Sequence, residues 1–204
     1  MRTVMRTTFG RFCFSCVALV CLALLGTPSS ATANVNVHLV GNLVVGTCDL
    51  VLESGGQKVD MRGVLASEFE TVQTASIHNF QLIITDCNGV DVGHSLAISV
   101  QGTTLTQDNK IFNDNPSEEL GFMLKENGTA AVNYWPGTKA DYYNASGTVI
   151  PGQESQTMPV PGADPTGIRL NYIAGIVSPK MGVGAVTATP RKITATVTFN
   201  VEYH

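Results

Sequence analysis

The sequence has no cluster of basic residues, and this absence limits the partners that the protein can bind. Of its 204 residues, 12 are Lys or Arg and 16 are Asp or Glu. Binding to nucleic acid or to an anionic membrane generally needs a concentrated basic patch. The composition therefore argues against nucleic acid and against membrane surfaces as partners.

Motifs of catalytic and metal sites are missing as well. The sequence contains no GxSxG elbow, no HExxH pair and no phosphate-binding glycine loop. Glu118 and Glu119 are adjacent carboxylates in polar sequence, where solvated surface charge is the expected role. The isolated histidines do not have the spacing of metal ligands; they are His38, His78, His94 and His204. The sequence therefore predicts no enzyme, no cofactor and no metal site.

No apolar run reaches the roughly 20 residues of a membrane-spanning helix. The N-terminal segment instead has the pattern of a secretory signal peptide, with a basic start, a short apolar core at Phe12–Leu25 and the small residues Ala31-Thr32-Ala33. We expect residues 1–33 to be removed and the mature chain to be exported. Lipoprotein processing at Cys21 is disfavoured, because the valine before it is not a small residue.

Removal of 33 of the 204 residues leaves a mature chain of 171, a length that fits one domain. The signal takes three of the 12 basic residues, so 9 remain against 16 acidic ones and the formal charge is −7. Three of the five cysteines are lost with it, which leaves Cys48 and Cys87. In an exported protein such a pair is expected to form a disulfide, which stabilises the fold by about 4 kcal/mol.

The end of the chain alternates strictly between apolar and polar side chains. Residues 193–203 place an apolar side chain at every second position, which predicts a half-buried β-strand. Other β-rich runs recur between turn-forming clusters; they cover residues 35–41, 48–52, 80–84, 96–100, 121–125 and 168–176. Residues 64–72 are expected to form a helical turn or two at most. Many short strands without helices predict an antiparallel sandwich.

The longest stretch without a pattern runs from Asn133 to Thr166 and contains Trp135, Tyr142 and Tyr143. We interpret it as an excursion over the surface of the sandwich, in which the aromatic side chains anchor the loop. The alternative is an aromatic platform that binds a sugar.

Three segments resemble the pilins of the chaperone–usher family, the subunits of type 1-like and P-like fimbriae. Val35-Asn-Val-His-Leu-Val-Gly41, ending seven positions before Cys48, resembles the N-terminal extension of these pilins. Leu82-Ile-Ile-Thr-Asp-Cys87-Asn resembles the strand with the second cysteine, and 195–204 resembles the C-terminal motif with its penultimate tyrosine. One departure is Arg191, at a position where family members often have glycine.

The resemblance implies an all-β fold, namely an incomplete immunoglobulin-like sandwich at 48–204 that lacks its last strand. Residues 34–47 would form an extension that completes the sandwich of a neighbouring subunit, a form of β-augmentation. The donor residues would be Val35, Val37, Leu39, Gly41 and Leu43. The edge of the groove and the contact with the chaperone would be formed by Val197, Phe199, Val201 and Tyr203.

The implied partners are a periplasmic chaperone, which lends a strand first, an outer-membrane usher and neighbouring pilin subunits. The expected function is that of a structural subunit, a minor or adaptor one given Arg191 and the long loop, in a fimbrium on the bacterial surface. For residues 35–43 the alternative is an ordinary first strand paired within its own domain. For the whole chain it is an exported glycan-binding module or a fimbrial adhesin.

Overall fold

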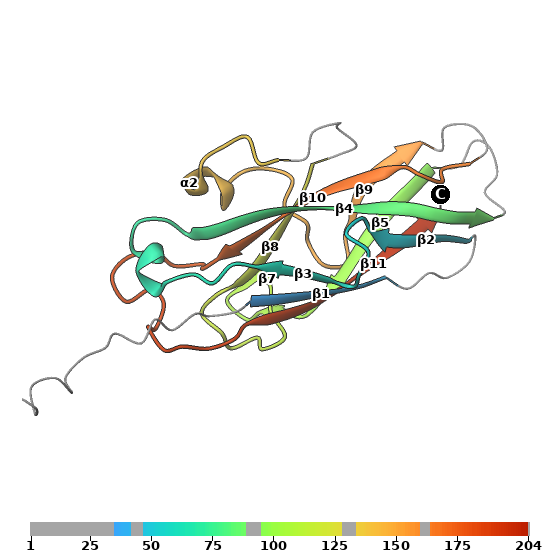
Figure 1. Ribbon diagram of the computed structural model, residues 1–204. Coiled ribbons are helices and arrows are strands. Elements are labelled where there is room, and N and C mark those ends of the chain that lie inside the picture. Colours follow the sequence, from blue (N-terminus) through green and yellow to red (C-terminus); the bar gives the residue numbers. More distant parts are fainter. Residues whose placement is uncertain (1–34, 42–46, 89–94, 128–133, 160–163, 204) are drawn as a thin grey trace, which may run out of the picture. The chain divides into compact units, whose positions relative to one another are not determined.

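The computed structural model describes residues 35–41, 47–88, 95–127, 134–159 and 164–203 (Figure 1). The chain divides into two compact units, Met1–Ala31 and Thr32–His204. The expected signal peptide and its cleavage site lie outside the described residues. Among the residues that are described, no helix is long and apolar enough to cross a membrane.

The described part of Thr32–His204 is built from strands in two sheets, which confirms the all-β prediction. The first sheet has the order β3-β1-β11-β5-β9 and the second has the order β2-β4-β10-β8-β7-β6. The strands are β1 (Val35–Gly41), β2 (Thr47–Leu52), β3 (Lys58–Met61), β4 (Thr74–Asn88), β5 (Ser95–Gly102), β6 (Thr104–Leu105), β7 (Asp108–Phe112), β8 (Gly121–Glu126), β9 (Glu154–Pro159), β10 (Arg169–Val177) and β11 (Thr194–Tyr203). The helical turns are η1 (Ala66–Glu70) and α2 (Lys139–Tyr142).

Buried side chains from both sheets form the main hydrophobic core. An aromatic cluster lies in this core: the rings of Phe80 and Tyr172 are stacked with centroids 5.6 Å apart, and Phe199 meets Tyr172 edge-on at 5.0 Å. Each such pair contributes about 0.5–1.5 kcal/mol beyond its buried area. Because Phe199 comes from β11 and the other two rings come from the second sheet, the cluster joins the two sheets.

A second core lies on the other side of the second sheet. Ile111, Met123 and Ile173 are buried there beneath Tyr142, whose hydroxyl lies 2.9 and 2.8 Å from the carbonyl oxygens of Met123 and Ile173. A side chain at Gly175 would collide with the ring of Tyr142. The close approach of the ring to the backbone therefore depends on this glycine.

Lys125 is a buried cation within the second core. Its Nζ donates hydrogen bonds to the carbonyl oxygen of Ala145, at 2.5 Å, and to Oγ1 of Thr148, at 2.7 Å. The ammonium also lies 5.2 Å from the centre of the Tyr142 ring, a favourable cation–π distance. Burial, together with the smaller effect of the charge of Lys110, lowers the pKa of Lys125 to about 8. These contacts fasten the 134–148 stretch to β8.

The predicted disulfide is confirmed. Cys48, near the start of β2, is bonded to Cys87, near the end of β4, with an S–S distance of 2.05 Å. The helical turn expected within 64–72 is η1. The Cys48–Cys87 bond joins positions 39 apart and closes a loop that contains β3 and most of β2 and β4.

Short polar strands were missed by the sequence pattern. β9 lies within the stretch 133–166, which was expected to lack regular structure, and it pairs with β5 at the margin of the first sheet. Its sequence, ESQTMP, has no apolar alternation. An edge strand has only one neighbour and needs little burial, so the hydrophobic pattern does not reveal it. β3, β6 and β7 were missed because they are short, with 4, 2 and 5 residues.

Candidate functional site

The predicted donor segment lies in the first sheet of its own chain (Figure 1). β1 runs parallel to β11, from Asn36 opposite Thr194 to Gly41 opposite Phe199. It also runs antiparallel to β3, from Val35 opposite Met61. This pairing matches the alternative stated above for residues 35–43, in which they form an ordinary first strand paired within its own domain.

The predicted donor residues Val35, Val37, Leu39 and Gly41 all lie on β1. Leu43 lies outside the described residues. Pairing within the chain does not test whether the segment is donated to another copy, so the donor role stays a prediction.

β1 lies between β11 and β3 and pairs with both strands. It forms the one parallel pair in the described sheets, and parallel ladders are slightly less stable per residue than antiparallel ones. β3 has no other strand partner in the described first sheet. Without β1, one side of β11 would carry unpaired backbone groups from Thr194 to Phe199.

The predicted groove-edge residues lie on β11, whose alternation is confirmed. The side chains of Val197, Phe199 and Val201 are buried in the main core, whereas Thr196 is exposed. On its other side β11 pairs with β5, from Val197 opposite Gly102 to Tyr203 opposite Leu96. A strand placed where β1 lies would therefore complete the sheet on the side of β11 that faces away from β5.

An apolar cleft of about 320 Å³ opens at the end of the β1–β11 ladder. Phe199, which is opposite the last residue of β1, lines it together with Leu50, Leu52 and Leu82 of the second sheet. The space between the two sheets is thus open at this point.

The first residues of β11 are held by the loop before β8 rather than by β5. The backbone N–H of Asp114 donates to the carbonyl oxygen of Thr194 at 2.8 Å, and the N–H of Thr196 donates to Oδ1 of Asp114 at 2.7 Å. Because pairing with β5 begins only at Val197, Asp114 takes the place of a strand partner for this part of β11.

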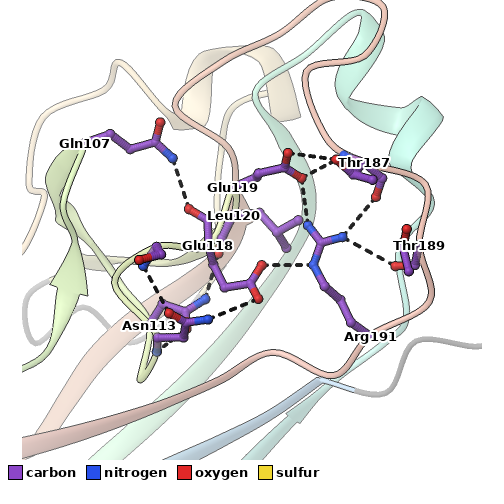
Figure 2. A network of polar contacts seen from close by, with 10 residues as sticks. Gln107, Asn113, Glu118, Glu119, Leu120, Thr187, Thr189 and Arg191 are labelled. Atoms are coloured by element: carbon purple, nitrogen blue, oxygen red, sulfur yellow. Dashed lines mark hydrogen bonds and ion pairs between the residues drawn. The ribbon is translucent and has the colours of Figure 1, made fainter.

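A network of polar contacts holds the segment that leads into β11 (Figure 2). Arg191 donates from Nε to Glu118 and from Nη2 to Glu119, both at 2.9 Å. Its Nη1 donates to the carbonyl oxygens of Thr187 and Thr189, at 3.0 and 3.4 Å. The N–H and the hydroxyl of Thr187 each donate to Glu119 at 2.8 Å. We call Arg191, Glu118, Glu119 and Thr187 the Arg191 network.

The Arg191 network corrects one expectation from the sequence. Glu118 and Glu119 are not simply solvated charges: both are ion-paired with Arg191, whose side chain is only 23% exposed. Hydrogen bonds from Thr187, and then the charge of Arg191, hold the pKa of Glu119 below its usual value. The partners are about 70 positions apart in the sequence, so no local motif could have shown the pairing.

The aromatic residues of the long loop anchor it, as the favoured interpretation predicted. Tyr142 is fully buried, and Trp135 meets its ring edge-on at 5.0 Å while donating from Nε1 to the carbonyl oxygen of Thr138. The hydroxyl of Tyr143 donates to Asp108 at 2.5 Å. These rings are used within the fold, and Tyr142 is inaccessible to a sugar. No cluster of three possible metal ligands occurs among the described residues.

Comparison with protein families gives a match over nearly the whole chain. The model of the fimbrial protein family matches residues 28–204. This chain belongs to the fimbrial protein family. Proteins of this family are the subunits of fimbriae, so the predictions of a fimbrial subunit with a β-sandwich fold are confirmed. Comparison with curated protein sequences gives no match.

Solved structures share the fold of this fimbrial protein. The P pilus rod subunit PapA is similar with a TM-score of 0.52 and 16% identity, over 77% of this chain and 99% of PapA. A chain from a chaperone–usher pilus, described for the molecular basis of rod uncoiling, has a TM-score of 0.52 and 15% identity, with both chains covered completely. At such identities the likeness establishes the shared fold.

Proposed function

We propose that this fimbrial protein polymerises by donor-strand exchange. In this reaction the β1 segment leaves its own sheet and completes the first sheet of a neighbouring copy. The observation that carries the proposal is the position of β1, the first strand of the chain, which the expected removal of residues 1–33 would place at its end. Among the described strands it is the one partner of β3 and forms the one parallel pair. A strand at a chain end can be replaced without threading the chain through the fold.

The sequence of the segment supports the exchange energetically. Val35, Val37, Leu39 and Leu43 would enter the neighbour's groove on one face, and Gly41 would allow close backbone approach. Burial of four such side chains contributes about 6–12 kcal/mol before the cost of ordering the segment. Hydrogen bonds of the backbone ladder add to this. Each subunit would therefore be held by an element that is well suited to β-augmentation.

The partners follow from the same proposal. An open edge beside Val197, Phe199, Val201 and Tyr203 would aggregate, so a periplasmic chaperone is needed to cover it before assembly. An outer-membrane usher would then exchange the chaperone for the next subunit. The similar chain from a chaperone–usher pilus supports this route, which ends in a fimbrium on the bacterial surface. We assign a minor or adaptor position because Arg191 replaces the glycine that pilins often have.

The test replaces one donor residue by a charge. Val37→Asp should abolish fibres in cells that express the chaperone and usher, because an aspartate in an apolar groove is costly to bury. Val40→Asp is the matched control, since strand alternation places Val40 on the other face. Fibre yield is scored by electron microscopy and subunit level by immunoblot. Normal fibres from Val37→Asp, at normal subunit levels, would overturn the donor role.

The rival function, an exported glycan binder, makes the opposite prediction. Deletion of residues 34–42 should leave a donor pilin able to form a complex with the chaperone but unable to polymerise. A glycan binder with the same deletion would remain a monomer with unchanged affinity for its sugar. The burial of Tyr142 and the internal contacts of Trp135 and Tyr143 count against this rival.

A further inference from the structure

The two halves of β11 are held in different ways. From Val197 onward β5 supports the strand through a regular antiparallel ladder. Before Val197 the strand has no ladder with β5; on that side Asp114 binds it, and the Arg191 network lies just upstream, while β1 pairs with its other side. The first pair of the β1–β11 ladder, Asn36 opposite Thr194, lies in this half, where β5 gives no ladder.

We propose that Arg191 is a positioning residue that restrains strand exchange: with Glu118 and Glu119 it fixes the lead-in to β11 and so limits the opening of the first pairs of the β1–β11 ladder. This inference rests on the proposed function. Arg191 does not touch the exchanging strand in any described contact; it acts through the backbone that it holds.

The chemistry of the network fits this role. A guanidinium presents several donors in a fixed plane, so one side chain can bind two carboxylates and two carbonyl oxygens at once. Arg191 makes all four of these contacts, and its partners lie on two segments that are far apart in sequence. A glycine at this position, which is frequent in the family that the sequence resembles, would make none of them. The connection is thus a property of this chain.

The Arg191 network lies beside the end of the β1–β11 ladder that starts with Asn36 opposite Thr194. Strand ends open more readily than strand centres. If the lead-in is loosened, the first pairs of the β1–β11 ladder open more often, and an incoming strand gains access from this end. Loss of Arg191 should therefore speed exchange, rather than merely lower the overall stability of the sandwich.

A second arginine of the chain provides the control. Arg169, at the start of β10, donates from Nε to Glu53 at 3.1 Å, and both side chains are about half exposed. This pair has the same chemistry but is on the second sheet. Arg169→Met removes an arginine–glutamate contact without touching the lead-in to β11.

The experiment measures strand exchange on the mature chain, residues 34–204. A fluorescent synthetic peptide of residues 34–46 is added in excess, and its incorporation is followed by anisotropy. We expect Arg191→Met to incorporate the peptide about tenfold faster than the wild type, the effect of losing one charge-assisted hydrogen bond. Arg169→Met should stay within twofold. The amide of Thr196 should also exchange with deuterium faster in Arg191→Met than in Arg169→Met.

The possible outcomes separate the two proposals. If the wild type incorporates the peptide and Arg191→Met does so at the same rate, the role of Arg191 is wrong while donor-strand exchange stands. If no variant incorporates the peptide, donor-strand exchange itself is contradicted, and the role of Arg191 with it. Arg191→Lys serves if Arg191→Met does not fold; a single ammonium cannot reproduce the planar set of contacts, so we expect an intermediate rate. A wild-type rate for Arg191→Lys in that case would also overturn the role.

Discussion

The two sheets are completed by the chain in contrasting ways. The outer side of the second sheet is covered by the 134–148 stretch, fastened by the buried side chains Tyr142 and Lys125. The first sheet is completed by β1, the first strand of the chain, which is joined to its neighbours by backbone ladders. Side-chain anchors of specific shape fix the first kind of cover to its sheet. A ladder of backbone hydrogen bonds depends less on the side chains, and under the proposed exchange a strand of similar pattern replaces the second kind of cover.

The sharpest test of this contrast is Tyr142→Ala. The substitution removes a fully buried ring and its hydroxyl, so the free energy of unfolding should fall by about 3–5 kcal/mol. Urea unfolding followed by fluorescence measures this loss. Tyr134→Ala is the control, because the side chain of Tyr134 is 56% exposed and its loss should cost at most about 0.5 kcal/mol. Equal losses in the two variants would show that the 134–148 stretch is not a fixed cover.

The disulfide should have the next largest effect. Replacement of Cys48 and Cys87 by alanine should lower the free energy of unfolding by about 2–4 kcal/mol, because the 39-residue loop is no longer closed in the unfolded chain. Chemical reduction of the wild type, compared with reduction of the double variant, provides the control. If the double variant unfolds at the same urea concentration as the oxidised wild type, the disulfide contributes nothing to stability.

Lys125, which holds the 134–148 stretch, should make the stability of the protein depend on pH. Its pKa is about 8 in the folded protein, against 10.5 ordinarily, so between these values the folded state binds fewer protons than the unfolded one. The free energy of unfolding should therefore rise with pH from about 8 upward, whereas below pH 8 Lys125 is protonated in both states and adds no pH dependence. The buried hydroxyl of Tyr142, whose pKa is raised by burial, opposes the rise above pH 10.

The measurement compares melting temperatures of the wild type and of Lys125→Met from pH 7 to 10. The difference between them isolates the titration of Lys125, because both contain Tyr142. A difference that does not change over this range would mean that Lys125 is not desolvated in the folded protein.

The smallest expected effect concerns Arg169→Met on the second sheet. An exposed arginine–glutamate pair contributes about 0–1 kcal/mol, and the salt bridge of Arg169 with Glu53 is of this kind. Differential scanning calorimetry in low and in high salt should show a small loss that salt removes. A loss larger than that caused by removal of the disulfide would contradict the view that this pair is peripheral.

The features that could be predicted from the sequence are those with a local physical pattern. The alternation of residues 193–203 identified β11 and the buried face that contains Val197, Phe199 and Val201, because successive side chains of a strand point to opposite faces. The pair Cys48 and Cys87 was identified because only two cysteines follow the expected signal segment, and the two are bonded in the structure. β9 was missed, since a polar edge strand has no such pattern.

By itself the sequence determined the longer strands with an apolar pattern, the disulfide, the family resemblance and the suitability of residues 35–43 for pairing. Tertiary structure alone decided which partner each of these elements meets. The pairing of β1 with its own β11, the cover over the second sheet and the junction of Arg191 with Glu118 and Glu119 all join residues far apart in the chain. Strand propensity is a property of neighbouring residues, whereas pairing depends on the free edges and charges that the whole fold brings together.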